Sequence, residues 1–115
     1  MRAYVTGLGA GDLSVLDRYL APGVIEHNPV MPSGAANMKA VYTGVFAQFP
    51  DLTFDVERVI GEGDLVAVHA HLVAVPGTRG QALGEIFRVK DGRIVEIWSS
   101  TQDVPETSLN TNTMF

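Results

Sequence analysis

The chain has 115 residues, enough for one domain with a buried core, and 46% of them are hydrophobic. It has no cysteine, which excludes disulfides and thiolate metal sites, and its net charge of −5 with scattered Lys and Arg argues against nucleic acid as a partner. No apolar run approaches the roughly 18 residues of a membrane span and no signal-peptide pattern opens the sequence, so we expect a cytoplasmic protein without a membrane contact.

The first half of the chain predicts helices. A short helix is expected near residues 1–8, and a second one follows Asp12, which has the character of an N-cap. Pro22-Gly23 is expected to end that second helix. Residues 24–34, with two prolines, predict a short extended segment and then a loop. The third helix is marked by one apolar stripe at helical spacing, formed by Met38, Val41, Tyr42, Val45, Phe46 and Phe49.

From Leu52 onward the hydrophobic period changes to two, which predicts strands. The expected strands lie near residues 53–60, 64–75, 81–90 and 93–103. The connections are short, and Asp91-Gly92 is a strong hairpin signal, so the strands should be antiparallel neighbours. A further short strand is expected near residues 24–27. Helices followed by strands predict an α+β fold, in which the helices cover one face of a curved antiparallel sheet and leave a pocket at the open end of a cone.

Titratable side chains alternate with apolar ones along these strands. His69 and His71 are two residues apart, so both rings point to one face, and Glu85 alternates with Leu83 and Phe87 on the next strand. We expect both histidines, Glu85 and Trp98 to surround one half-apolar hollow. Imidazole titrates near neutral pH, and burial would raise the pKa of a carboxyl toward the range useful for proton transfer. Glu85 is the best candidate for that role.

Each of these residues also has a structural interpretation. The histidine pair fits equally well on a convex dimer surface, hydrogen-bonded across subunits. Glu85 fits an ion pair with Arg79, Arg88 or Arg93. His27 is expected at the cavity mouth, where it would bind ligand, or else it caps a backbone group. The three histidines with Glu85 have spacing that permits a metal site, but His-x-His on a strand is common without a metal, and we expect none.

Several other residues are candidates for binding a substrate. Trp98, Phe46 and Phe87 are expected to form apolar walls, because an indole or phenyl ring more often lines a pocket than reacts. Gln102 shares a face with Trp98 and has an amide that can hydrogen-bond a ligand carbonyl. Tyr42 lies on the stripe of the third helix, with its hydroxyl expected at the cavity edge.

Five segments carry a resemblance to a known family. They are Tyr19-Leu-Ala-Pro, Ile25-Glu-His-Asn-Pro, Val59-Ile-Gly-Glu-Gly-Asp-Leu-Val-Ala-Val-His-Ala-His, Ile86-Phe-Arg-Val-Lys-Asp-Gly-Arg-Ile-Val-Glu-Ile-Trp, and Val104-Pro-Glu through Asn112-Thr-Met-Phe. Together they resemble the SnoaL-like branch of the NTF2-like superfamily, which includes polyketide cyclases and ketosteroid isomerases. The resemblance implies an NTF2-like (cystatin-like) cone, no metal, and His27 at the pocket. Polyketide cyclases of the family use an Asp further along the last strand as acid and base, whereas this chain has Ser99, Ser100 and Gln102 there.

These observations lead to three hypotheses for one domain over residues 1–115. The first is a cyclase-like lyase or isomerase without a cofactor, which removes a proton next to a carbonyl of a largely apolar small molecule in an aldol-type cyclisation, isomerisation or dehydration. Glu85 or a histidine would be the base, and His27, Gln102 or a second histidine would donate to the oxyanion. The second, favoured by the missing Asp, is a non-catalytic small-molecule-binding protein, and the third is a scaffold domain with a filled cavity. We also expect a homodimer formed through the sheet, with the tail 106–115 flexible or draped over the partner.

Overall fold

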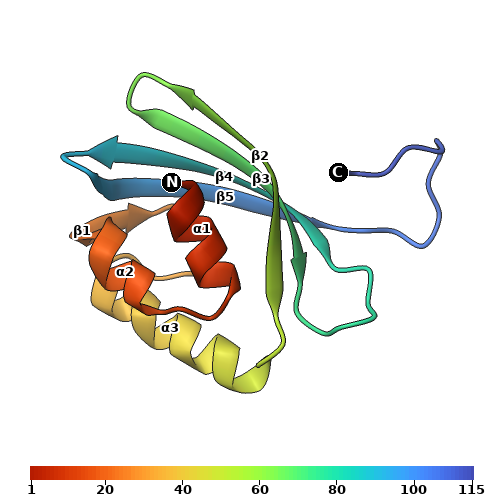
Figure 1. The fold of residues 1–115 in the computed structure, drawn as a ribbon, viewed down its shortest axis with the longest axis horizontal. Helices are drawn as coiled ribbons and strands as arrows, with labels where there is room; N and C mark the ends of the chain where they lie inside the picture. Colours follow the sequence, from red (N-terminus) through yellow and green to blue (C-terminus); the bar gives the residue numbers. More distant parts are fainter.

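A computed structural model describes residues 1–115. Its three helices all pack on one side of a single curved sheet (Figure 1). In chain order the elements are α1 (Arg2–Gly9), α2 (Ser14–Tyr19), β1 (Leu20–Glu26), α3 (Ala35–Gln48), β2 (Thr53–Glu62), β3 (Leu65–Val73), β4 (Gln81–Lys90) and β5 (Arg93–Asp103). This is the α+β architecture that the change of period predicts. None of the helices has both the length and the hydropathy required to cross a membrane.

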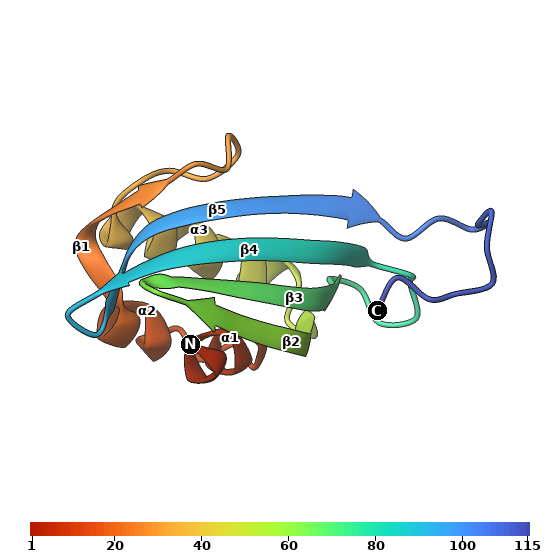
Figure 2. The same ribbon diagram turned by 90° about the horizontal axis from the view of Figure 1, so that it is seen from above.

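The sheet is mixed and has the strand order β1-β5-β4-β3-β2. Strands β2 to β5 are antiparallel neighbours, as expected, but β1 pairs with β5 in parallel. The expectation of an all-antiparallel sheet is therefore wrong at one edge. In Figure 2, β1 lies beside the start of β5, and the long strands β4 and β5 cross the middle of the sheet.

Pro22-Gly23 does not end a helix as predicted. Helix α2 already ends at Tyr19, and Pro22-Gly23 lies inside β1. There the pairing with β5 shifts register, between Leu20 and Ile25. An edge strand tolerates a proline because it has a neighbouring strand on one side only, so a backbone N–H on its other side has no hydrogen bond to make within the sheet. Leu13, and not Asp12 as predicted, occupies the N-cap position of α2, but the Asp12 carboxylate still accepts a hydrogen bond of 3.1 Å from the backbone N–H of Ser14, the first residue of the helix.

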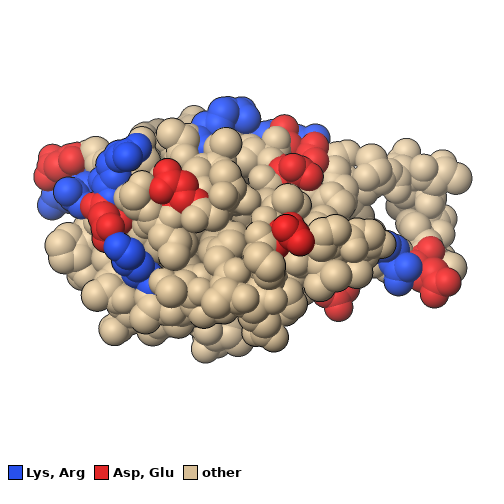
Figure 3. All heavy atoms as spheres, turned by 60° about the horizontal axis from the view of Figure 1, so that its bottom comes forward, with Lys and Arg blue, Asp and Glu red and all other residues tan.

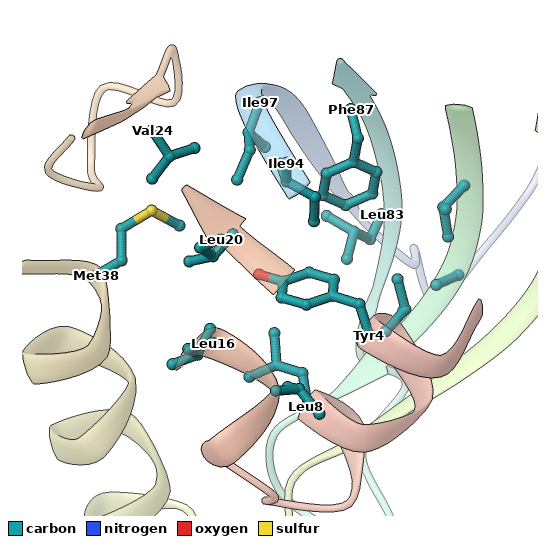
Figure 4. Packing of buried hydrophobic residues seen from close by; sticks show 14 residues of the cluster. Tyr4, Leu8, Leu16, Leu20, Val24, Met38, Leu83, Phe87, Ile94 and Ile97 are labelled. Atoms are coloured by element: carbon teal, nitrogen blue, oxygen red, sulfur yellow. The ribbon is translucent and has the colours of Figure 1, made fainter. Parts of the chain in front are cut away.

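The core lies between the helices and the inner face of the sheet, which is the face toward them (Figure 4). Its largest buried side chains include Tyr4 and Phe87, whose rings meet edge-on with their centroids 5.7 Å apart. On α3 only Met38 is buried, and the rest of the apolar stripe is half-buried. Helix α3 therefore does not close fully onto the sheet.

The segment after β5 leaves the body of the domain and turns back toward the sheet (Figure 2). Residues 105–113 are all exposed, whereas Met114 and Phe115 are half-buried. The Phe115 ring stacks on His71, with the centroids 4.1 Å apart. The end of the tail thus packs against its own chain on the outer face of the sheet, which carries no helices.

The face shown in Figure 3 is largely uncharged, and its Lys, Arg, Asp and Glu side chains are scattered with both signs interspersed. No continuous basic patch forms on this face.

Candidate functional site

The two faces of the sheet separate the candidate residues into two groups. Residues directly opposite each other on neighbouring strands share a face. Glu85 of β4 lies opposite Val68 of β3, which is buried, and opposite Ser99 of β5. Glu85 and Ser99 therefore face the helices. Trp98 comes one residue before Ser99 and has the other orientation.

A cavity of about 170 Å³ opens on this inner face. It lies between the sheet, α3 and the loop that follows β1. Its lining consists of Glu26, Asn28, Val30, Met31, Tyr42, Val45, Phe46, Leu52, Phe54, Leu72, Leu83, Glu85, Ser99 and Thr101. Most of these side chains are apolar, and no Lys, Arg or His is among them. A mostly apolar hollow with a few convergent polar groups is the usual form of a small-molecule site.

A wider hollow of about 650 Å³ lies near the turns after β2 and β4. It is more open, and its only carboxylate, Asp64, is already paired with Arg88 at 2.8 Å. The smaller cavity is therefore the better candidate site, because it is more enclosed and holds unpaired titratable groups.

Glu85 is the central titratable group of the cavity. Its carboxyl has no hydrogen bond and no ion pair with any other residue, so the expected alternative of a pairing with Arg79, Arg88 or Arg93 is wrong. The side chain is half-buried because the cavity opens onto it, yet protein surrounds it closely. Burial, with a smaller contribution from the charge of Glu26, raises the pKa of Glu85 to about 8. At neutral pH the group is mostly a neutral acid.

A second carboxyl, Glu26, lies at the end of β1. It pairs with Ile97, which is buried, so its side chain also points to the inner face. Its Oε1 accepts a hydrogen bond of 2.9 Å from the backbone N–H of Asn28. Burial raises the pKa of Glu26 despite this hydrogen bond, which lowers it. The Asn28 amide donates to Ser99 Oγ at 3.1 Å, which ties this loop to the strand next to Glu85.

Tyr42 and Phe46 line the cavity from α3, where they were expected. Burial, followed by the charges of Glu85 and Glu26, raises the pKa of Tyr42, so its hydroxyl stays a neutral donor. Burial likewise raises the pKa of Tyr4, with contributions from Tyr42 and both carboxyls, which places Tyr4 close behind the cavity. Phe87 belongs to the core and is not part of the cavity lining.

The three histidines lie on the outer face, so the expectation of one hollow shared with Glu85 is wrong. His27 Nε2 lies 2.7 Å from Glu96 Oε2, and its ring stacks on Trp98 with the centroids 4.9 Å apart. His71 Nε2 lies 2.7 Å from the Arg79 carbonyl oxygen. His69 lies opposite Gly84, contacts Arg58 and stacks on Phe115.

Trp98 and Gln102 are also on the outer face, so neither forms a wall of the cavity. Trp98 lies opposite Ile86, and Gln102 lies opposite Ala82. The guanidinium of Arg88 covers the Trp98 ring at 5.6 Å from its centroid. The metal alternative is contradicted as well, because the outer-face histidines and the inner-face Glu85 do not form a group of ligands.

Sequence reasoning missed four polar residues of the cavity: Glu26, Asn28, Ser99 and Thr101. A partial signal was present for two of them, because the Asp91-Gly92 hairpin predicts that β4 pairs with β5. The register of that hairpin alone would place Trp98 opposite Glu85, and the shift between Arg88 and Val89 instead brings Ser99 opposite Glu85 and Thr101 opposite Leu83. Glu26 had no comparable signal, because its position depends on a parallel pairing between segments far apart in the sequence.

Comparisons with known proteins agree with this fold. The family model of the SnoaL-like domain matches residues 1–97. No curated protein matches the sequence. A solved structure of IdmH from Streptomyces antibioticus, assigned provisionally as a polyketide cyclase, is 28% identical, with 86% of each chain covered and a TM-score of 0.69.

Two further solved structures are similar in fold. A SnoaL-like protein of unknown function from Burkholderia thailandensis has a TM-score of 0.76 and 21% identity, with 88% of this chain and 90% of that chain covered. A protein from Agrobacterium tumefaciens, assigned provisionally as an isomerase of the SnoaL-like family, has a TM-score of 0.73 and 15% identity, with 88% and 92% covered.

Proposed function

The chain belongs to the SnoaL-like family, and from this premise we propose that it is an enzyme that transfers a proton next to a carbonyl of a small, largely apolar molecule. The observation that carries the proposal is the state of Glu85. Its carboxyl is unpaired, lies in an apolar cavity and has a pKa raised to about 8. A general acid or base works best when its pKa lies near the working pH.

Each step of the reaction has a group in the cavity. The ionised Glu85 carboxylate takes a proton from the carbon next to the carbonyl, and the electron pair of that C–H bond forms the enolate. The neutral Tyr42 hydroxyl donates a hydrogen bond to the enolate oxygen. The enolate then takes this proton back from Glu85 at another carbon, which gives isomerisation, or attacks a second carbonyl, whose oxygen takes the proton from Glu85 as the C–C bond forms, which gives aldol-type cyclisation. The apolar side chains around the cavity keep water away from the enolate.

The size of the cavity limits the reacting part of the substrate. At about 170 Å³ it is close to the roughly 150 Å³ of an engineered apolar cavity that holds benzene. One ring therefore fits beside Glu85. A longer substrate would extend past Val30 at the rim, whose side chain is 81% exposed.

Proton exchange tests the proposal without knowledge of the natural substrate. In D₂O, the wild-type protein should speed the loss of the α-proton signal of small cyclic ketones, followed by ¹H NMR. The rate should rise with pH and level off above about pH 8, as Glu85 ionises.

Glu85→Gln should lower the exchange rate about 100-fold or more, and Tyr42→Phe about tenfold. Glu96→Gln is the matched control, because Glu96 is a carboxylate of the outer face, and it should leave the rate unchanged. Exchange that survives Glu85→Gln at the wild-type rate would show that the proposed base is wrong.

The second candidate function is non-catalytic binding of a small molecule. It is favoured by β5, which presents only the hydroxyls of Ser99 and Thr101 to the cavity. Neither hydroxyl titrates near neutral pH. A ligand that copurifies with the protein and stays unchanged on long incubation, together with no ketone exchange, would support this alternative.

A further inference from the structure

We propose that the substrate carries a protonated amine, and that Glu26 and Glu85 bind this amine together in the cavity. The inference deepens the proposed function and rests on it in one respect, namely that the same cavity is the substrate site.

The ionisable carboxyl groups that line the cavity have no basic side chain beside them in the lining. Two carboxyl groups line it and no cationic side chain does. The nearest basic residue on the same strand, Arg88, points to the outer face, where it pairs with Asp64 and Glu96 at 2.8 and 3.1 Å. No cationic side chain therefore neutralises Glu85, and the only one near Glu26 is the His27 ring, which is already paired with Glu96 on the outer face. A buried carboxylate without a partner is unfavourable, and a cationic ligand supplies the missing partner.

The hydrogen bonds around the cavity also favour a ligand that donates hydrogen bonds. Glu85 has no partner at all, and Glu26 uses only Oε1, which accepts from the backbone of Asn28. The side chain of Asn28 is already occupied, because its amide donates to Ser99 and its oxygen accepts from the backbone N–H of Val30. The free positions thus include three carboxyl oxygens, which accept hydrogen bonds, beside the hydroxyls of Tyr42, Ser99 and Thr101. An ammonium group has three donors and no acceptor, and it complements them.

An ammonium ion in this position would also prepare the base for reaction. With only protein groups around it, Glu85 is mostly protonated at pH 7. The titratable groups that face it are Glu26 from β1, Tyr42 from α3 and Tyr4 from α1, and none of them is a cation. A bound ammonium favours the ionised carboxyl, so Glu85 releases its proton to the solvent and becomes a carboxylate. The base would therefore form when the matching substrate binds.

Three ligands of nearly equal size test this proposal in binding alone. Benzylamine is cationic at neutral pH, benzyl alcohol is neutral and benzoate is anionic. Isothermal titration calorimetry at pH 7, in two buffers with different ionisation enthalpies, gives both the affinity and the number of protons released. We expect benzylamine to bind at least about tenfold more tightly than benzyl alcohol, and benzoate not to bind. Benzylamine binding should release most of one proton and should tighten between pH 6 and pH 8.

Three variants assign the effect to the carboxyl pair. Glu85→Gln should abolish the proton release and the pH dependence, and Glu26→Gln should lower the affinity for benzylamine about tenfold. Glu57→Gln removes an exposed carboxylate of β2 that does not line the cavity, and it should behave like wild type. If Glu85→Gln does not fold, the pH dependence of the wild-type protein and the Glu26→Gln variant still decide the question.

Equal affinity for benzyl alcohol, binding of benzoate, or no binding of benzylamine would each overturn the amine assignment. Its failure is separable from that of the proposed function. If ketone exchange depends on Glu85 but the protein does not prefer the amine, only the amine assignment is wrong. If the protein binds the amine selectively and releases a proton but does not catalyse ketone exchange, only the proposed catalytic step is wrong.

Discussion

Two glutamates of the sheet show how strongly the environment of a residue determines its chemistry. Glu85 on the inner face has a pKa raised by burial. Glu96 on the outer face has a pKa lowered mainly by its hydrogen bond with His27, with a further contribution from Arg88. Both lie on neighbouring strands of one sheet and differ mainly in which face they occupy. Only the inner glutamate is a suitable proton donor near neutral pH.

The raised pKa of Glu85 predicts a dependence of stability on pH. The folded protein keeps a proton on Glu85 up to about pH 8, whereas the unfolded chain loses it near pH 4.5. The contribution of Glu85 to the free energy of unfolding is therefore complete below about pH 4.5 and is lost as the pH rises to about 8, by about 1.4 kcal/mol for each pH unit in that window. Urea denaturation at pH 5, 6.5 and 8 should show a loss of a few kcal/mol in wild type and a much flatter profile in Glu85→Gln. Parallel profiles for the two proteins would contradict the raised pKa.

At the scale of elements, the position of α1 depends on a glycine contact. A Cβ atom on Gly9 would lie 2.8 Å from Cβ of Phe54 and 3.1 Å from its backbone N, both closer than ordinary contacts. Phe54 belongs to β2 and lines the cavity. The close approach of α1 to β2 thus helps to hold one wall of the site.

A pair of glycine substitutions tests this contact. Gly9→Ala should lower the free energy of unfolding by about 1–3 kcal/mol, because the extra methyl group pushes α1 away from β2. Gly44→Ala on α3 meets nothing within 4 Å and should raise stability by about 0.5–1 kcal/mol, because alanine favours a helix. Chemical denaturation of both variants measures the difference. A Gly9→Ala variant as stable as Gly44→Ala would show that α1 does not pack this closely.

At the scale of the whole molecule, the helices lie on one side of the sheet (Figure 1), the cavity opens on that same side, and the other side carries no helix. The outer face carries the exposed side chains Ile60 and Ile86, which are 64% and 43% accessible, together with the ring of Trp98. Only the end of the tail folds over part of this face, where Phe115 stacks on His71. We therefore retain the proposal that two copies pack together through the outer face.

This proposal predicts the mass of the protein in solution. Light scattering coupled to gel filtration should give about twice the chain mass of 12.3 kDa. Ile86→Glu should shift the protein toward the monomer without a change in the circular dichroism spectrum, because burying a charge at an interface is unfavourable. A wild-type protein that elutes as a monomer at high concentration would rule out this pairing.

Local patterns were sufficient for most elements. The period of two after Leu52 and the Asp91-Gly92 turn predicted four antiparallel strands, and the structure confirms them with ends that move by at most two residues. The apolar stripe predicted α3 in the same way. The parallel strand β1 was only partly foreseen, as a short strand near 24–27, because no local signal indicates which distant strand it will join.

The sequence alone established that Glu85 alternates with apolar residues and that His69, His71 and Trp98 lie on strands, since the side-chain direction within one strand follows from backbone geometry. Only the tertiary structure decided which side chains of different strands share one face of the sheet, and which face the helices cover. The first depends on the register between strands, which includes a shift between Arg88 and Val89, and the second depends on where the helices pack. Those long-range contacts place Glu85 and Glu26 in one cavity and leave the histidines on the opposite side of the sheet.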